Sequence, residues 1–187
     1  MGSLYIPIKR QNDKMNSVLD SFENVSTTRI TLILFIVTFA AASPIIIGYE
    51  AKDRPNRESI SDIDIFRDRA NTILDGDLLY SDTDMVTMTP PLINYLMAPA
   101  IIFGDTVVVW ELWFTFFVFL TSVIIFFILE PMAGKRLALT GGMIYASSPF
   151  GFYTCVAMIQ DDAIIVIFLE HSALFLLKEL VFINTDT

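Results

Sequence analysis

Residues 90–104 read PPLINYLMAPAIIFG, and whether this apolar stretch crosses a membrane decides the sidedness of everything that follows it. The stretch is short for a transmembrane helix, which needs about 20 apolar residues, and it contains Asn94 and Pro99. An interfacial or re-entrant helix over about 91–103 is therefore expected instead of a span. If the stretch did cross, Lys135 and Arg136 would lie outside, against the positive-inside rule.

Four other stretches are long and apolar enough to span, at residues 30–49, 107–129, 137–158 and 163–182. Both termini are then cytoplasmic. The basic residues on that side are Lys9, Arg10, Lys14, Arg29, Lys135, Arg136 and Lys178. The rule is obeyed only in part, because three cations stay outside in either arrangement, namely Lys52, Arg54 and Arg57.

Composition favours the same class of protein. Of the 187 residues, 54% are hydrophobic, and the mean hydropathy of +0.60 is high for a soluble domain. A cleaved signal peptide is the alternative for 30–49, but its apolar core would be only about 7–15 residues long. We expect an all-α, multi-pass protein of the cell membrane with a transmembrane domain over 30–182, cytoplasmic tails at 1–29 and 183–187, and an external loop at 50–106.

Charge and cysteine content exclude some classes. The formal net charge of -9 argues against nucleic acid as a partner, because a polyanion would be repelled. Cys155 is the single cysteine, so neither an internal disulfide nor a cysteine-based metal site is possible within the chain.

The external loop contains a predicted amphipathic helix over about 62–75. Its start matches the pattern [ST]-x-x-[DE] at Ser61 to Asp64, and Gly76 stands where a helix would stop. Its apolar residues recur at helical spacing, namely Ile63, Phe66, Ala70, Ile73 and Leu74. We expect this helix to lie on the membrane surface.

Carboxylates are concentrated in the same loop, at Asp62, Asp64, Asp68, Asp75, Asp77, Asp82 and Asp84. Four spans would bring Asp161 and Asp162 to the same face of the membrane. One carboxylate could then take a proton from an acceptor while a second orients it or holds a divalent cation. The structural alternative is that these acids only cap the helices that begin beside them.

The run DIDIFRDRANTILDGDLLYSDTD followed by TPPLINYL resembles the first external loop of the GT-C superfamily of polyprenyl-phosphate-sugar-dependent glycosyltransferases. In that pattern an acidic pair begins a juxtamembrane helix, a Gly and a Tyr close it, and a Pro-Pro segment leads to the next membrane helix. The matching positions here are Asp62, Asp64, Gly76, Tyr80, Pro90 and Pro91. The family's second external loop carries an acidic residue, which Asp162 in QDDA resembles most closely.

The resemblance implies a hexosyltransferase that passes a sugar from a polyprenyl phosphate to an acceptor hydroxyl at the external face. Asp62 would deprotonate the acceptor, and Asp64 and Asp162 would position acceptor or metal. The implied substrate-binding residues are Arg67, Arg69, Tyr80 and Asp161, with an arginine neutralising the departing phosphate. Metal use varies within the superfamily, so a divalent cation stays open, with Asp62 and Asp162 as its candidate ligands.

The chain also departs from the family pattern, because usual members carry further spans after the fourth. A truncated form or a form that requires a second membrane chain is therefore an alternative, as is a noncatalytic membrane subunit. Glu170 and His171 lie within the fourth span, where ionisable residues are costly and point to function or to helix contacts. They also leave open a small transporter.

Overall fold

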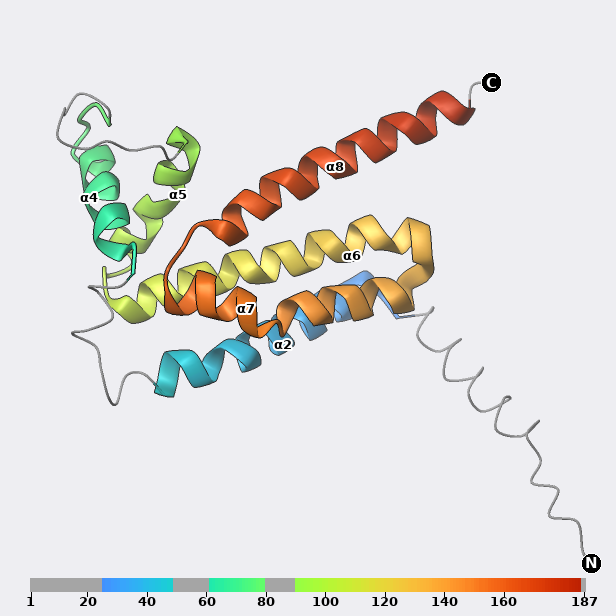
Figure 1. The fold of residues 1–187 in the computed structure, drawn as a ribbon, viewed down its shortest axis with the longest axis horizontal. Coiled ribbons are helices and arrows are strands. Elements are labelled where there is room, and N and C mark those ends of the chain that lie inside the picture. Colours follow the sequence, from blue (N-terminus) through green and yellow to red (C-terminus); the bar gives the residue numbers. More distant parts are fainter. Residues whose placement is uncertain (1–24, 49–60, 80–89, 186–187) are drawn as a thin grey trace, which may run out of the picture.

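The structure is a computed structural model that describes residues 25–48, 61–79 and 90–185. Within these ranges every regular element is helical, and no strand is present. The elements in chain order are α2 (Thr27–Gly48), α4 (Ile63–Leu74), α5 (Pro91–Ile102), α6 (Val107–Ala146), α7 (Pro149–Gly151), the π-helix η1 (Phe152–Ala157) and α8 (Asp162–Thr185). Figure 1 shows α4 and α5 together at one end of the longer helices.

The helix α6 is a hairpin of two arms. Its helical geometry is interrupted at Gly134, which has φ 77° and ψ 161°, a conformation that is available essentially only to glycine. Figure 1 shows the chain turning back at this point, so that residues 135–146 run beside the first arm. The turn EPMAGKR, expected between the second and third spans, is therefore built around Gly134.

Close packing in this hairpin depends on two glycines, Gly141 and Gly142. A Cβ on Gly142 would lie 2.9 Å from the backbone oxygen of Ser122, whereas one on Gly141 would lie 2.5 Å from the Cδ1 tip of Leu129. The obstacle at Gly142 is rigid backbone, whereas the obstacle at Gly141 is the end of a side chain that can rotate.

Replacing Gly142 by Ala is therefore expected to destabilise the protein by about 1–3 kcal/mol, because the two arms must separate. Gly141→Ala is the matched control and should cost less, since Leu129 can move and alanine favours helix. Thermal unfolding of both variants in detergent measures the difference. Equal effects of the two substitutions would contradict the packing described here.

The third predicted span, 137–158, is wrong as a single helix. The second arm of α6 ends at Ala146, and α7 and η1 follow separately. Pro149 explains the break, because proline lacks an N–H and disfavours helical geometry in the residue before it. Ser148 accordingly has φ -65° and ψ 118°, an extended conformation.

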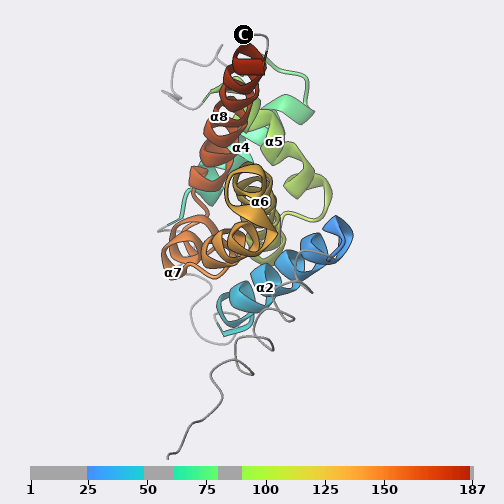
Figure 2. The ribbon, with the colours of Figure 1, turned by 90° about the vertical axis from the view of Figure 1, so that its right-hand side faces the viewer.

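Two described helices are long and apolar enough to cross a membrane, Thr27–Ile47 and Val107–Ala146, each with a window of mean hydropathy 2.6. Only 22% and 39% of those windows are buried, so many of their apolar side chains are exposed. The helix α8 leaves the others toward the carboxyl terminus, as Figures 1 and 2 show. At 12 residues, α5 is about 18 Å long and too short to span, as expected from residues 90–104.

The apolar face of α4 is largely covered by other parts of the protein, and the expected position of this helix at the membrane surface stays a prediction. Ile63, Phe66 and Ala70 are buried in the main hydrophobic core of the protein. Phe66 stacks with Trp110 at a ring-centroid distance of 6.5 Å and contacts Phe114 at 5.9 Å. Two aromatic side chains of α6 therefore cover part of this face, and α4 packs more extensively against α5.

Candidate functional site

The amino-terminal end of α4 is attached to the turn that precedes α8. The backbone N–H of Asp62 donates to the carbonyl oxygen of Met158 at 3.3 Å, although the two residues are far apart in the sequence. Asp62 occupies the N-cap position, but its side chain makes no capping hydrogen bond. The carboxylate of Asp62 therefore makes no capping hydrogen bond, although it still lies at the positive end of the α4 dipole, as the structural alternative requires.

A strained turn brings the second pair of acids to Asp62. Ile159 has φ 51°, which a β-branched residue rarely adopts, and such strain costs about 1–3 kcal/mol. Its side chain is 1% exposed, so burial offsets part of that cost. After this turn α8 begins, and the backbone oxygen of Asp161 accepts from the N–H groups of Ile164 and Ile165 at 2.9 and 3.0 Å.

Arg69 and Asp162 act electrostatically on Asp62, and Asp162, Asp62 and Arg69 act on Asp161, so these four residues lie within range of one another's charges. Burial is the main cause that raises the pKa of Asp62 above 3.8. Arg69 lowers it and Asp162 raises it. Burial also raises the pKa of Asp161, where the Asp162 and Asp62 carboxylates add to the effect. Arg69 therefore acts electrostatically on two of these carboxylates, those of Asp62 and Asp161.

Arg69 is held within the protein. Only 8% of the surface of Arg69 is exposed to solvent. Its Nη1 donates a hydrogen bond to Oδ1 of Asn94 at 3.3 Å. Asn94 is fully buried on α5, and its Nδ2 has no hydrogen-bond partner within the described part of the chain. Asn94 therefore joins α5 to the candidate site.

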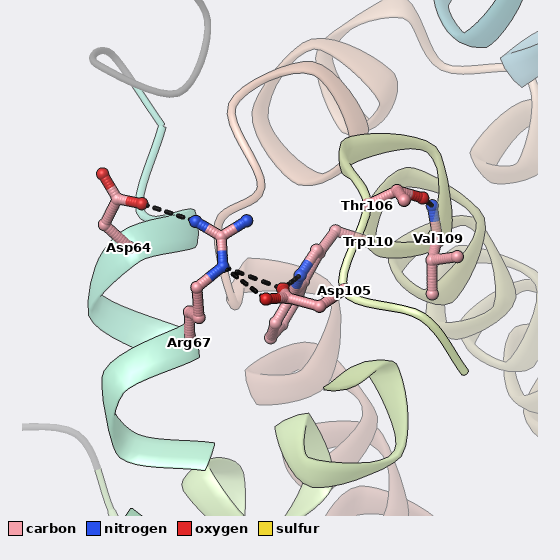
Figure 3. Close-up of polar contacts among 6 residues, drawn as sticks. All are labelled: Asp64, Arg67, Asp105, Thr106, Val109 and Trp110. Atoms are coloured by element: carbon pink, nitrogen blue, oxygen red, sulfur yellow. Dashed lines mark hydrogen bonds and ion pairs between the residues drawn. The ribbon is translucent and has the colours of Figure 1, made fainter. Parts of the chain in front are cut away.

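Arg67 is engaged in a different cluster, which Figure 3 shows. Its Nη1 donates to Oδ1 of Asp64, and its Nε donates to both carboxylate oxygens of Asp105, each at 2.8 Å. Trp110 Nε1 also donates to Oδ1 of Asp105 at 2.9 Å. These contacts attach α4 to the turn between α5 and α6. Asp64 and Arg67 thus take part in contacts that hold α4 in place.

Sequence reasoning missed Asn94 and Asp105 as site residues. In the sequence, Asn94 is a polar residue within an apolar stretch, and this pattern indicated only that the stretch does not span a membrane. Asp105 precedes the cap Thr106, whose Oγ1 accepts from Val109 N at 3.3 Å, and nothing local distinguished it from a turn residue. Tyr80 lies outside the residues that the structure describes.

A metal site receives no support from the described carboxylates. Among the residues with described positions, no group of three or more His, Cys, Asp and Glu side chains is placed to hold an ion. The described acids around Asp62 therefore do not provide a cation cage by themselves.

An apolar groove of about 330 Å³ lies between α5 and α8. Its lining residues are Pro90, Leu92, Ile93, Ile165, Phe168, Leu169 and Ser172. Ile93 is next to Asn94 in the sequence, and Ile165 follows Asp162 by about one helical turn. The groove therefore begins near the charged group.

The raised pKa values of Asp62 and Asp161 predict a dependence of stability on pH. The folded chain binds the protons on these two carboxyl groups more tightly than the unfolded chain does. The protein therefore loses stability as the pH rises from 3.8 through the raised pKa values of Asp62 and Asp161. Asp62→Asn is expected to raise the melting midpoint at pH 7 by up to about 3 °C, with the gain disappearing toward pH 4. Thermal unfolding in detergent at both pH values measures this effect. Asp68→Asn, at an exposed position of α4, should show no such gain.

Comparison with protein-family models, with curated proteins and with solved structures finds no match to this chain. The resemblance to the GT-C superfamily thus rests on the short motifs quoted above.

Proposed function

We propose that this chain is a multi-pass membrane protein with four spans and both termini in the cytoplasm. The spans are α2, the two arms of the α6 region continued through α7 and η1, and α8. The exposed apolar side chains of α2 and α6 support this proposal, because helices in the core of a soluble protein would be mostly buried. The charged group around Asp62 then lies at the external face.

Labelling of single cysteines tests this arrangement in a Cys155→Ser background. Asp77→Cys is expected to react with a membrane-impermeant maleimide from outside intact cells. Met132→Cys, at an exposed residue of the hairpin turn, should react only after the membrane is permeabilised. Reaction of Met132→Cys in intact cells would place the hairpin turn outside and refute the four-span arrangement.

We further propose that the chain is a GT-C-like glycosyltransferase, or the amino-terminal part of one, which acts on a polyprenyl-phosphate sugar. The observation that carries this proposal is the group formed by Asp62, Asp161 and Asp162 with Arg69. The electrostatic interactions among these residues link the beginning of α4 to the beginning of α8, and a polar acceptor and a lipid phosphate would both bind there. The alternative that Asp62 serves only as a hydrogen-bonding cap receives no support, because its side chain makes no capping hydrogen bond.

The reaction proposed here is the one that the GT-C resemblance implies, with roles assigned to these charges. The acceptor hydroxyl oxygen forms a bond to the anomeric carbon while the bond from that carbon to the phosphate oxygen breaks, and the configuration inverts. The polyprenyl phosphate leaves with the electron pair, and the hydroxyl proton passes to Asp62. A raised pKa makes Asp62 a stronger base, and Arg69 stabilises the phosphate charge. Arg67 is less suited to that role because two carboxylates already bind it.

Asp161 and Asp162 would orient the acceptor by accepting hydrogen bonds from its other hydroxyl groups. The apolar groove between α5 and α8 would receive the first isoprene units of the donor. Reconstitution of the purified chain in vesicles with a labelled polyprenyl-phosphate sugar tests the proposal. Transfer that depends on Asp162 supports it. A chain that binds the donor without transferring the sugar, even with its co-purifying partners present, would refute it.

A noncatalytic membrane subunit is the second candidate, and Glu170 favours it. One carboxylate oxygen of Glu170 is buried without a hydrogen-bond partner among the described residues, and His171 beside it is exposed. Ionisable groups within a span usually pair with another helix. Stoichiometric co-purification of a second membrane chain, lost in Glu170→Leu, would support this role.

A further inference from the structure

A second groove, of about 500 Å³, lies at the opposite end of the molecule from Asp62. It is formed by the first turns of α2 together with Phe119 of α6. Its lining residues are Thr27, Thr28, Thr31, Leu32, Phe35 and Phe119. Figure 1 shows that α2 begins at the end where α6 turns back, away from α4 and α5.

The lining of this groove changes in polarity along α2. Three threonine hydroxyls lie within its first turns, and Leu32 and Phe35 follow further along the helix. Phe35 contacts Phe119 edge-on at a ring-centroid distance of 5.5 Å. The groove is therefore polar at the beginning of α2 and apolar toward the middle of the helix. The same change in polarity occurs in a bilayer between the head groups and the acyl chains.

A lysine lies near the polar end of the groove. Lys135 Nζ donates to the carbonyl oxygen of Val25 at 3.4 Å, which places this ammonium group at the beginning of α2. Arg136 and Arg29 are exposed at the same end, and Glu130 is the acid in the hairpin turn. Among the residues that the structure describes, cations exceed acids here, whereas carboxylates exceed cations at the Asp62 end.

We propose that this groove binds an anionic phospholipid of the cytoplasmic leaflet. The lipid phosphate would lie between Lys135 and the threonine hydroxyls, and one acyl chain would lie against Leu32, Phe35 and Phe119. Charge complementarity selects an anionic lipid over a neutral one, because basic residues at the cytoplasmic surface attract acidic head groups. The proposal rests on the four-span arrangement but not on glycosyl transfer, so a chain without transferase activity would leave it intact.

Native mass spectrometry of the full chain from nanodiscs tests this site. In equimolar phosphatidylglycerol and phosphatidylcholine, the wild type is expected to retain phosphatidylglycerol preferentially. Lys135→Gln with Arg136→Gln should lower that preference by about tenfold or more, at about fivefold for each cation. Lys178→Gln on α8, which removes the same type of charge elsewhere, should leave the preference unchanged.

A second variant separates the groove from charge alone. Thr31→Trp fills the groove and keeps every cation, so it should also reduce retention of phosphatidylglycerol, with thermal unfolding used to confirm that the variant is folded. Soluble glycerol phosphate should not displace the lipid, because the acyl chain contributes to binding. Equal retention of the two lipids by the wild type, displacement by glycerol phosphate, or full retention by folded Thr31→Trp would each overturn the proposal.

Discussion

Asp62→Asn is expected to lower the rate of sugar transfer by about 10²–10⁴-fold, the usual contribution of a general base. The substitution keeps the shape of the side chain and the backbone hydrogen bond from residue 62 to Met158, but it removes the group that accepts the proton. Turnover of a polyprenyl-phosphate sugar in vesicles measures the loss. Donor binding should change little, because Arg69 and the apolar groove remain.

Asp68→Asn is the matched control for this experiment. Asp68 lies on the same helix and is exposed, so a neutral side chain at that position should leave turnover near that of the wild type. The pH profile adds a second measurement. Transfer by the wild type should fall as the pH decreases and Asp62 becomes protonated, at a pH above its ordinary value of 3.8. An active Asp62→Asn variant would rule out the assigned role.

Asp105→Asn is expected to give the largest loss of stability among polar substitutions at the Arg67 cluster, about 1–3 kcal/mol. Asp105 accepts from both Arg67 and Trp110, and it joins α4 to the beginning of α6. Asparagine tolerates the φ of 47° at this position, so the effect reports on lost charge and not on backbone strain. Thermal unfolding in detergent should show a midpoint lowered by about 3–8 °C.

Asp64→Asn removes the other partner of Arg67 and serves as the control. Both carboxylates lie 2.8 Å from the guanidinium group, but the side chain of Asp64 is 65% exposed and that of Asp105 is 33% exposed. Solvent screens the exposed pair, which should contribute under about 0.5 kcal/mol. If the two variants were equally stable, the attachment of α4 through Asp105 would be unimportant.

Periodicity and hydropathy were enough to predict most helices. The helix predicted at 62–75 is Ile63–Leu74, and the one predicted at 91–103 is Pro91–Ile102. Each follows from a local pattern, namely apolar spacing in the first and two prolines before an apolar run in the second. The same pattern failed at residues 137–158, where hydropathy stays high across Pro149 although the helix does not continue.

The candidate site was only partly predictable. The sequence could place Asp62 near Asp161 and Asp162 only through the assumed number of spans. It could not distinguish Arg67 from Arg69, since the two are neighbours on one helix with the same charge. Their different roles depend on residues from other helices, Asp105 for Arg67 and Asn94 for Arg69.

By itself the sequence determined that this protein is helical and strongly apolar, with its acids concentrated between the first two long helices. These properties are local, because backbone hydrogen bonds and hydropathy are set within each segment. Only the tertiary structure decided which face of α4 is covered, which arginine meets Asp62, and where the third helix breaks. Those outcomes depend on packing against Trp110 and Phe114 and on the strained turn at Ile159, which join segments that are distant in the chain.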